Sequence, residues 1–139
     1  MQSPDRTPVE IVPRRVGVSP GPSTPRYWLA DDPASTHLLN AMSITFPRGE
    51  QAFVDSVRAY KDSIEDPELA RSVRAFITQE MHHSRSHEDF NDWLRGLGLP
   101  VEVIEAEVER DTTQFQKNFS AEALLAGTCA LEHFTALLA

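Results

Sequence analysis

Residues 79–87 read QEMHHSRSH, and this stretch holds three of the five histidines in the chain. With 3.6 residues per turn, the spacing of Glu80, His83 and His87 puts their side chains on one face of a helix. Apolar residues before and after the stretch continue the same face: Leu69, Val73, Phe76, Ile77, Phe90 and Leu94. The polar trio therefore interrupts a stripe that should face a protein core, and the pattern predicts helices packed around it.

A buried carboxylate and two buried imidazoles need partners, because burying them alone costs several kcal/mol. A divalent metal ion supplies the compensating charge, and Glu-x-x-His on a core-facing helix is the unit of carboxylate-bridged di-metal bundles. We predict that Glu80 and His83 are metal ligands. His87 is predicted to be a third ligand, a residue that supports a ligand, or a proton carrier. His82 is turned about 100° away from that face and is expected at the surface.

The composition fits one domain with its own core, because a chain of 139 residues can bury about two-thirds of the surface that it exposes when extended. Twenty-one acidic and 13 basic residues give a net charge of −8, which repels phosphate backbones and anionic lipid head groups. Nucleic acid and membrane surfaces are therefore not expected partners. The single cysteine, Cys129, cannot close an intrachain disulfide, which favours a cytoplasmic protein.

The chain divides into a proline-rich arm over residues 1–32 and a helical bundle domain over residues 33–139. Prolines 4, 8, 13, 20, 22 and 25 exclude a long helix in the arm. Asp66 is expected to cap a helix that has Pro67 at its first position and the QEMHHSRSH stretch in its middle. The apolar spacing predicts helices over about 33–46, ending before Pro47, and over 49–64, 67–96 or 67–98, 100–119 and 121–139.

Two further glutamates lie on apolar faces of predicted helices. Glu50 is one turn ahead of Phe53 and Val54, so it either points toward the core or only favours the positive end of the helix dipole. Glu132 lies in the segment 121–139, which is apolar on nearly every side and is therefore expected to be buried. His133 beside it is either a partner of the metal site or a hydrogen-bonded core histidine. This central pair and the many alanines favour a bundle interior over a membrane span.

The chain ends inside this last helix, without the glycine, asparagine or basic residues that usually close a helix. We therefore expect it to be the N-terminal portion of a longer chain. An apolar helix with no successor leaves one flank uncovered, so we also expect a homo-oligomer.

Three segments carry a family resemblance: FPRGEQAF (46–53), DPELARSVRAFITQEMHHSRSHEDFN (66–91) and LEHFTALLA (131–139). In their order and spacing they resemble the predicted metal-dependent hydrolases of bacteria. The resemblance implies that the metal-site positions are Glu50, Glu80, His83, His87 and Glu132. It also implies that His133 belongs to the same motif, and that a family member continues into a further helix with another Glu and His set.

The residues also fit ferritin-like di-metal bundles, in which two helices give one glutamate each and two give Glu-x-x-His. Glu50, the pair Glu80–His83, and Glu132 make three of these four contributions. We therefore predict an all-α, incomplete ferritin-like helical bundle. Its ligands admit one or two ions of iron, manganese or zinc, and the carboxylate-rich mixture favours iron or manganese.

Two classes of function compete. A metal-dependent enzyme would activate water as a hydrolase, or dioxygen as a di-iron oxidase or oxygenase, over an apolar pocket that takes a small apolar or amphipathic substrate. Both reactions use the same ligands, so both stay open. A non-catalytic helical bundle that binds metal or self-associates is the alternative.

Overall fold

The computed structural model describes residues 11–17 and 20–138. This part of the chain folds into four α-helices and one short 3-10 helix and contains no strand. The elements are α1 (Pro33–Arg58), η1 (Lys61–Ser63), α2 (Pro67–Gly96), α3 (Val101–Asn118) and α4 (Ala121–Leu138). The prediction of an all-α helical bundle is confirmed.

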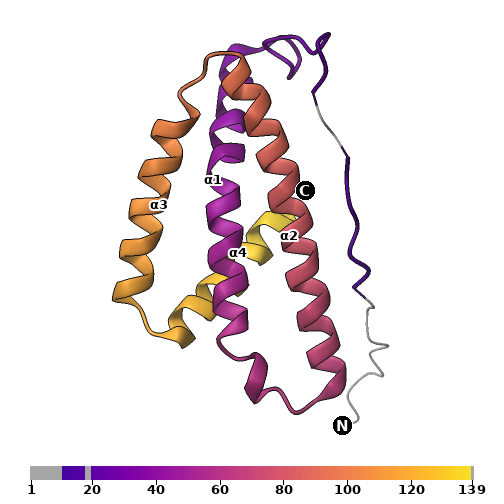
Figure 1. Cartoon of the computed structure of the whole chain (residues 1–139), viewed down its shortest axis with the longest axis vertical. Helices are drawn as coiled ribbons and strands as arrows, with labels where there is room; N and C mark the ends of the chain where they lie inside the picture. The colour runs from indigo at the N-terminus through magenta and orange to yellow at the C-terminus, as the bar shows by residue number, and fades with distance from the viewer. Residues whose placement is uncertain (1–10, 18–19, 139) are drawn as a thin grey trace.

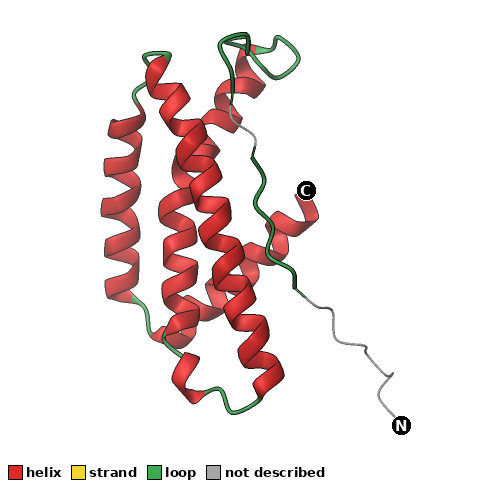
Figure 2. Ribbon diagram, turned by 45° about the vertical axis from the view of Figure 1, so that its right-hand side comes forward, coloured by secondary structure: helices red, strands yellow, loops and turns green. Residues whose placement is uncertain are grey.

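Helix α1 is the centre of the bundle, because it packs against each of the other three helices. α1 and α2 form a long antiparallel pair, α3 lies on the other side of α1, and α4 crosses α1 obliquely (Figure 1). The described part of the arm, residues 11–17, runs alongside α2 (Figure 2). The face of α2 that carries the histidines is therefore bordered by α1 on one side and by the arm on another.

The ends of the two long helices follow from local sequence. Asp32 and Asp66 cap α1 and α2: their carboxylates accept hydrogen bonds from the backbone N–H of Ser35 at 2.7 Å and of Glu68 at 2.8 Å. A proline follows each cap, where a missing N–H costs nothing. After α2, Gly98 has a φ of 77°, a conformation that a side chain disfavours, and it turns the chain into α3.

The predicted break before Pro47 is wrong, because α1 continues through this residue to Arg58. A proline has no N–H, so the carbonyl of Ser43, four residues earlier, loses its helical partner. The side-chain amide of Asn91 on α2 donates to that carbonyl at 3.1 Å, and both residues are buried. This bond satisfies the freed carbonyl, so the helix continues past the proline.

The core lies where α1, α2 and the start of α3 meet. Ile44, Leu94 and Val101 are buried there, and the apolar residues packed around them are Phe90, Trp93, Leu99 and Ile104. Burial of these side chains holds α1 and α2 in a fixed register, and this register positions the polar residues farther along the pair.

The expectation that the last helix is buried is wrong. Of the described side chains of α4 only Thr128 is buried, whereas Leu131, Phe134 and Leu137 are 52, 63 and 70% exposed. α4 crosses α1 and contacts it along one side, where the hydroxyls of Thr128 and Ser56 lie 2.8 Å apart. Across the residues that the structure describes, no helix has the length and apolarity needed to cross a bilayer.

Candidate metal centre

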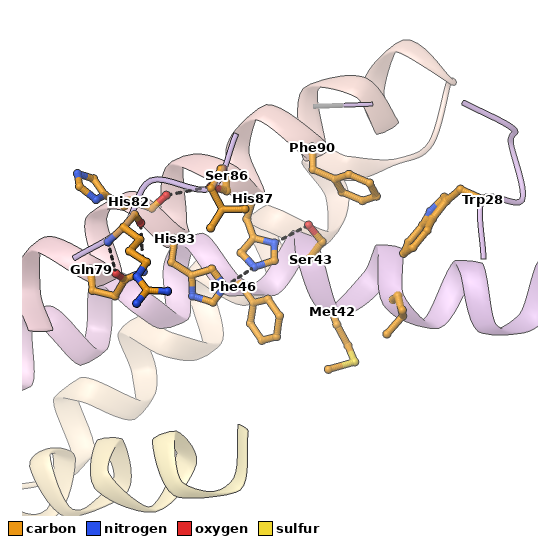
Figure 3. Close-up of a pocket in the computed structure, with 13 residues that line it drawn as sticks. Trp28, Met42, Ser43, Phe46, Gln79, His82, His83, Ser86, His87 and Phe90 are labelled. Atoms are coloured by element: carbon orange, nitrogen blue, oxygen red, sulfur yellow. Dashed lines mark hydrogen bonds between the residues drawn. The ribbon is translucent and has the colours of Figure 1, made fainter. Parts of the chain in front are cut away.

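Three of the predicted ligands converge between α1 and α2. Glu50 of α1 and His83 and His87 of α2 each offer one ligand atom, and these atoms all lie within 4.8 Å of one another. His83 Nδ1 is 2.9 Å from Glu50 Oε1, and His83 Nε2 is 3.1 Å from His87 Nε2. The two histidine rings lie side by side in Figure 3, one helical turn apart on α2.

The Glu50 carboxylate is buried but not satisfied. Its side chain is 4% exposed, and neither oxygen has a hydrogen-bond partner among the described residues. His83 Nδ1 is close enough to Glu50 Oε1 for an ion pair but does not form a hydrogen bond with it. A buried carboxylate without donors is costly, so this position calls for a cation.

The arrangement fits a transition-metal ion. Carboxylate oxygen and imidazole nitrogen are ligands of zinc, iron and manganese. Two nitrogens bound to one tetrahedral zinc ion at about 2.0–2.1 Å lie about 3.3 Å apart, close to the separation of the two Nε2 atoms. The three residues therefore offer the chemistry of a metal site, and the two Nε2 atoms have the spacing of two ligands of one ion, whereas Glu50 faces the other nitrogen of His83.

The ring of His87 is oriented by a chain of hydrogen bonds that begins at the buried Asn91 and Ser43. Because Asn91 Nδ2 donates to the Ser43 carbonyl, Asn91 Oδ1 is free to accept the Ser43 hydroxyl proton at 2.9 Å. Ser43 Oγ also lies 2.8 Å from His87 Nδ1 and, having given its only proton to Asn91, must accept from it. His87 therefore carries its proton on Nδ1, which leaves the lone pair on Nε2 facing His83.

Glu80 and Glu132 lie outside this group of three, but the charges of Glu50 and His83 alter the pKa values of both. Burial, together with the charges of Glu132 and Glu50, raises the pKa of Glu80 to about 7, while His83 works against this rise. Burial likewise raises the pKa of Glu132, opposed by His83 and reinforced by Glu50. Three carboxylates so placed repel one another unless a cation lies among them.

The two histidines differ in their charge environments. The Glu50 carboxylate beside Nδ1 raises the pKa of His83, with burial acting in the opposite direction. Burial lowers the pKa of His87, and the neighbouring His83 adds to this effect, with Glu50 opposing it. His87 is therefore the imidazole held more firmly in its neutral, ligating form.

The predicted convergence is thus only partly seen. Glu50 and His83 meet as expected, and His87 completes the group, whereas the ligand roles of Glu80 and Glu132 stay predictions. His133 is exposed and its ring packs edge-on against Phe134 at 6.2 Å, so the interpretation as a core histidine is wrong. A role for His133 beside the metal site stays a prediction.

Ser43 was not predicted from the sequence as a residue of the site, although its hydroxyl contacts the predicted ligand His87. The available signal was its position four residues before Pro47, where a carbonyl loses its helical donor. His82 was expected at the surface, but this residue is half-buried and its Nδ1 is enclosed without a hydrogen-bond partner in the described chain.

A cavity of about 430 Å³ opens beside His83 and His87. Its walls are mostly apolar, and they include Val16, Trp28, Leu39, Met42, Phe46 and Phe90. The ring of Phe46 lies 4.7 Å from that of His87 (Figure 3). An apolar pocket next to the ligands is what a site for a small apolar or amphipathic molecule requires.

We expect Ser43→Ala to weaken zinc binding by about 10- to 100-fold, the usual cost of losing a group that orients a metal ligand. The variant keeps every proposed ligand but removes the acceptor of the His87 Nδ1–H. Chelator competition measures the affinity, and ¹⁵N NMR of the metal-free protein should show the proton of His87 shifting toward Nε2. Thr45→Ala is the control, because within the described part of the chain that hydroxyl bonds only to the carbonyl of Met42. Equal affinities in Ser43→Ala and Thr45→Ala would contradict the assigned role.

Nearly the whole chain matches one protein family. The sequence model of the family described as predicted metal-dependent hydrolase matches residues 12–139, which include all residues of the site. The comparison with curated proteins found no match, and neither did the comparison with solved structures. The chain belongs to the family of predicted metal-dependent hydrolases.

Proposed function

We propose that this protein binds one or two ions of iron, manganese or zinc and hydrolyses a small apolar or amphipathic substrate. Glu50, His83 and His87 would hold the metal, with Glu80 and Glu132 completing the ligand set and His133 supporting it. The observation that carries the proposal is the buried carboxylate of Glu50, which has no hydrogen-bond donor among the described residues and lies beside two imidazoles at the end of an apolar cavity. When bound, such an ion supplies Lewis acidity and lowers the pKa of a bound water.

Other roles in the proposed reaction fall to residues of the chain itself. Glu50 provides the buried negative charge that retains a cation, and Ser43 fixes the ring of His87. Phe46 packs against both histidine rings, with centroids 6.2 Å from His83 and 4.7 Å from His87. Apolar surface therefore reaches the edge of the ligand set, although the predicted burial of His83 is wrong, since half of its side chain remains exposed to solvent. A substrate lying on this surface would bring its reacting group to the two histidines.

Two alternatives remain as proposals. In a ferritin-like di-iron site the same ligands would serve an oxidase or oxygenase. A non-catalytic, self-associating bundle is favoured by the exposed Leu131, Phe134 and Leu137 of α4, which a second copy of the chain could cover. A cytoplasmic location is consistent with the exposed free thiol of Cys129.

The test is turnover of p-nitrophenyl esters of increasing acyl length by protein loaded with zinc, manganese or iron, under argon and in air. We expect hydrolysis under argon, with kcat/KM at least about a hundredfold lower in His83→Ala, since a metal ligand is lost. Turnover that requires iron and dioxygen would support the oxidative alternative. Metal-bound protein that turns over nothing under either condition would contradict the enzyme assignment and favour the non-catalytic bundle.

A further inference from the structure

The side chains that line the cavity beside the histidines include an arginine and no carboxylate, although the protein as a whole is acidic. The chain has 21 acidic residues, yet none of the described ones lines this cavity. Neighbouring hollows along the same pair of helices differ, since glutamates such as Glu88 line both of them. The one permanently charged side chain in the lining of the histidine cavity is that of Arg14.

Arg14 is held at the cavity by its backbone. Its N–H donates to Gln79 Oε1 at 2.7 Å, and its carbonyl accepts from Gln79 Nε2 at 3.5 Å. Two residues later, the carbonyl of Val16 accepts from Ser86 Oγ at 3.1 Å. These bonds to α2 fix the arm segment without using the guanidinium. Among the described residues, no carboxylate forms an ion pair with Arg14.

The remaining residues that line the cavity are mostly apolar, so they suit the apolar part of a ligand. Trp28, Phe46 and Phe90 contribute aromatic surface, and Met42 adds an adaptable apolar side chain. A volume of about 430 Å³ lies in the range of small-molecule sites, about 300–1,000 Å³. An apolar body of medium length fits these walls, and a negative head group fits the guanidinium, which binds carboxylates through two parallel hydrogen bonds.

We propose that this cavity binds an amphipathic monocarboxylate, with its apolar chain on Trp28, Phe46 and Phe90 and its carboxylate on Arg14. The inference deepens the proposed function and rests on it for the reaction. Hydrolysis of an apolar ester adds water across the acyl–oxygen bond, so that an alcohol leaves and a carboxylate with a released proton remains. The molecule proposed for the cavity is thus of the product class of that reaction, and binding itself needs no metal.

The experiment is calorimetric titration of the full, metal-free chain in EDTA with octanoate, 1-octanol and octylamine, which share one chain length and differ in charge. We expect octanoate to bind about tenfold more tightly than 1-octanol, as for one charge-assisted hydrogen-bonded pair. Octylamine should bind most weakly. Raising the salt concentration should weaken octanoate binding and leave 1-octanol unchanged.

Variants of the arm separate the head-group contact from general apolar binding. Arg14→Ala should lose about tenfold in octanoate affinity and nothing for 1-octanol, while Arg14→Lys should keep part of the preference. Arg15→Ala is the matched control, since the next residue carries the same charge but does not line the cavity. Equal binding of octanoate and 1-octanol, equal loss in both alanine variants, or no binding of octanoate would overturn the proposal.

Glu50→Gln distinguishes this inference from the proposed function, because Glu50 does not line the cavity. Octanoate binding that persists in this variant, together with lost metal binding, supports both claims. Metal binding without octanoate binding in the wild-type protein overturns only the inference. Octanoate binding in a chain that takes up no metal overturns only the metal site.

Discussion

Replacing Glu50 by glutamine is expected to weaken zinc or manganese binding by at least about a hundredfold, the lower end of what losing one partner of a buried charge pair costs. Glutamine keeps the size of the side chain and removes the charge that lies 2.9 Å from His83. Because the carboxylate is buried and none of the described residues donates a hydrogen bond to it, no solvent charge can replace it. Competition against a metal-binding dye of known affinity measures the change.

The control for this variant is Glu107→Gln on α3, which removes the same charge from an exposed position. It lowers the negative charge of the protein equally and should leave metal affinity within about twofold of wild type, as expected for a screened surface charge. If both variants bound metal as wild type does, Glu50 would not be a ligand.

Without metal, the protein is expected to lose stability as the pH rises from 5 to 8, and Glu80→Gln should remove much of that loss. The folded-state pKa of Glu80 is about 7, above its ordinary value of 4.5. Between these values the folded chain keeps a proton that the unfolded chain releases, so stability falls with rising pH. Above pH 7 both states are ionised and the full cost of the buried charge, on the order of 1–3 kcal/mol after solvent screening, is present.

Neighbouring titratable groups determine how much pH dependence of stability remains in Glu80→Gln. The raised pKa values of Glu132 and His83 act in the same direction as that of Glu80, and the lowered pKa of His87 acts against it. Urea unfolding in EDTA at pH 5, 6, 7 and 8 measures the profile, with Glu107→Gln expected to follow wild type. At pH 8 Glu80→Gln should be more stable than wild type in EDTA. A wild-type stability that is flat or rises over this range would contradict the expectation.

The parts of the fold that local spacing determines were predictable. α2 begins after the Asp66 cap at Pro67 and ends at Gly96, as expected, because a cap, a proline and a 3.6-residue repeat act within a few positions. The same repeat put His83 and His87 on one face, and their ring nitrogens do meet. A single helix therefore contributed the larger share of what the sequence could predict about the site.

The features that were not predictable depend on contacts between helices. Pro47 was expected to break α1, but Asn91, 48 positions away from Ser43, satisfies the freed carbonyl. The register of α1 on α2 brings Glu50 to the histidines and leaves Glu80 outside their group. Such rotations and offsets are set by side-chain packing between helices, which a helical period does not encode.

The exposure of the last helix also depends on contacts between helices and could not be predicted from its sequence. Its composition favours burial on every side, yet burial also requires neighbours, and α4 has its main contacts with α1. Its apolar residues therefore remain exposed. The apolar composition of α4 allows burial on every side, whereas the crossing of α4 over α1 determines which of its side chains are buried.

Anomalous X-ray diffraction from crystals saturated with manganese or zinc tests the metal centre most directly. Data collected on either side of the absorption edge should show a peak within bonding distance of a Glu50 oxygen and of ring nitrogens of His83 and His87. Ser43 Oγ should remain against His87 Nδ1, so that His87 binds through Nε2. Metal-saturated crystals in which the peak lies elsewhere, or in which Glu50 has turned away from it, would contradict this account.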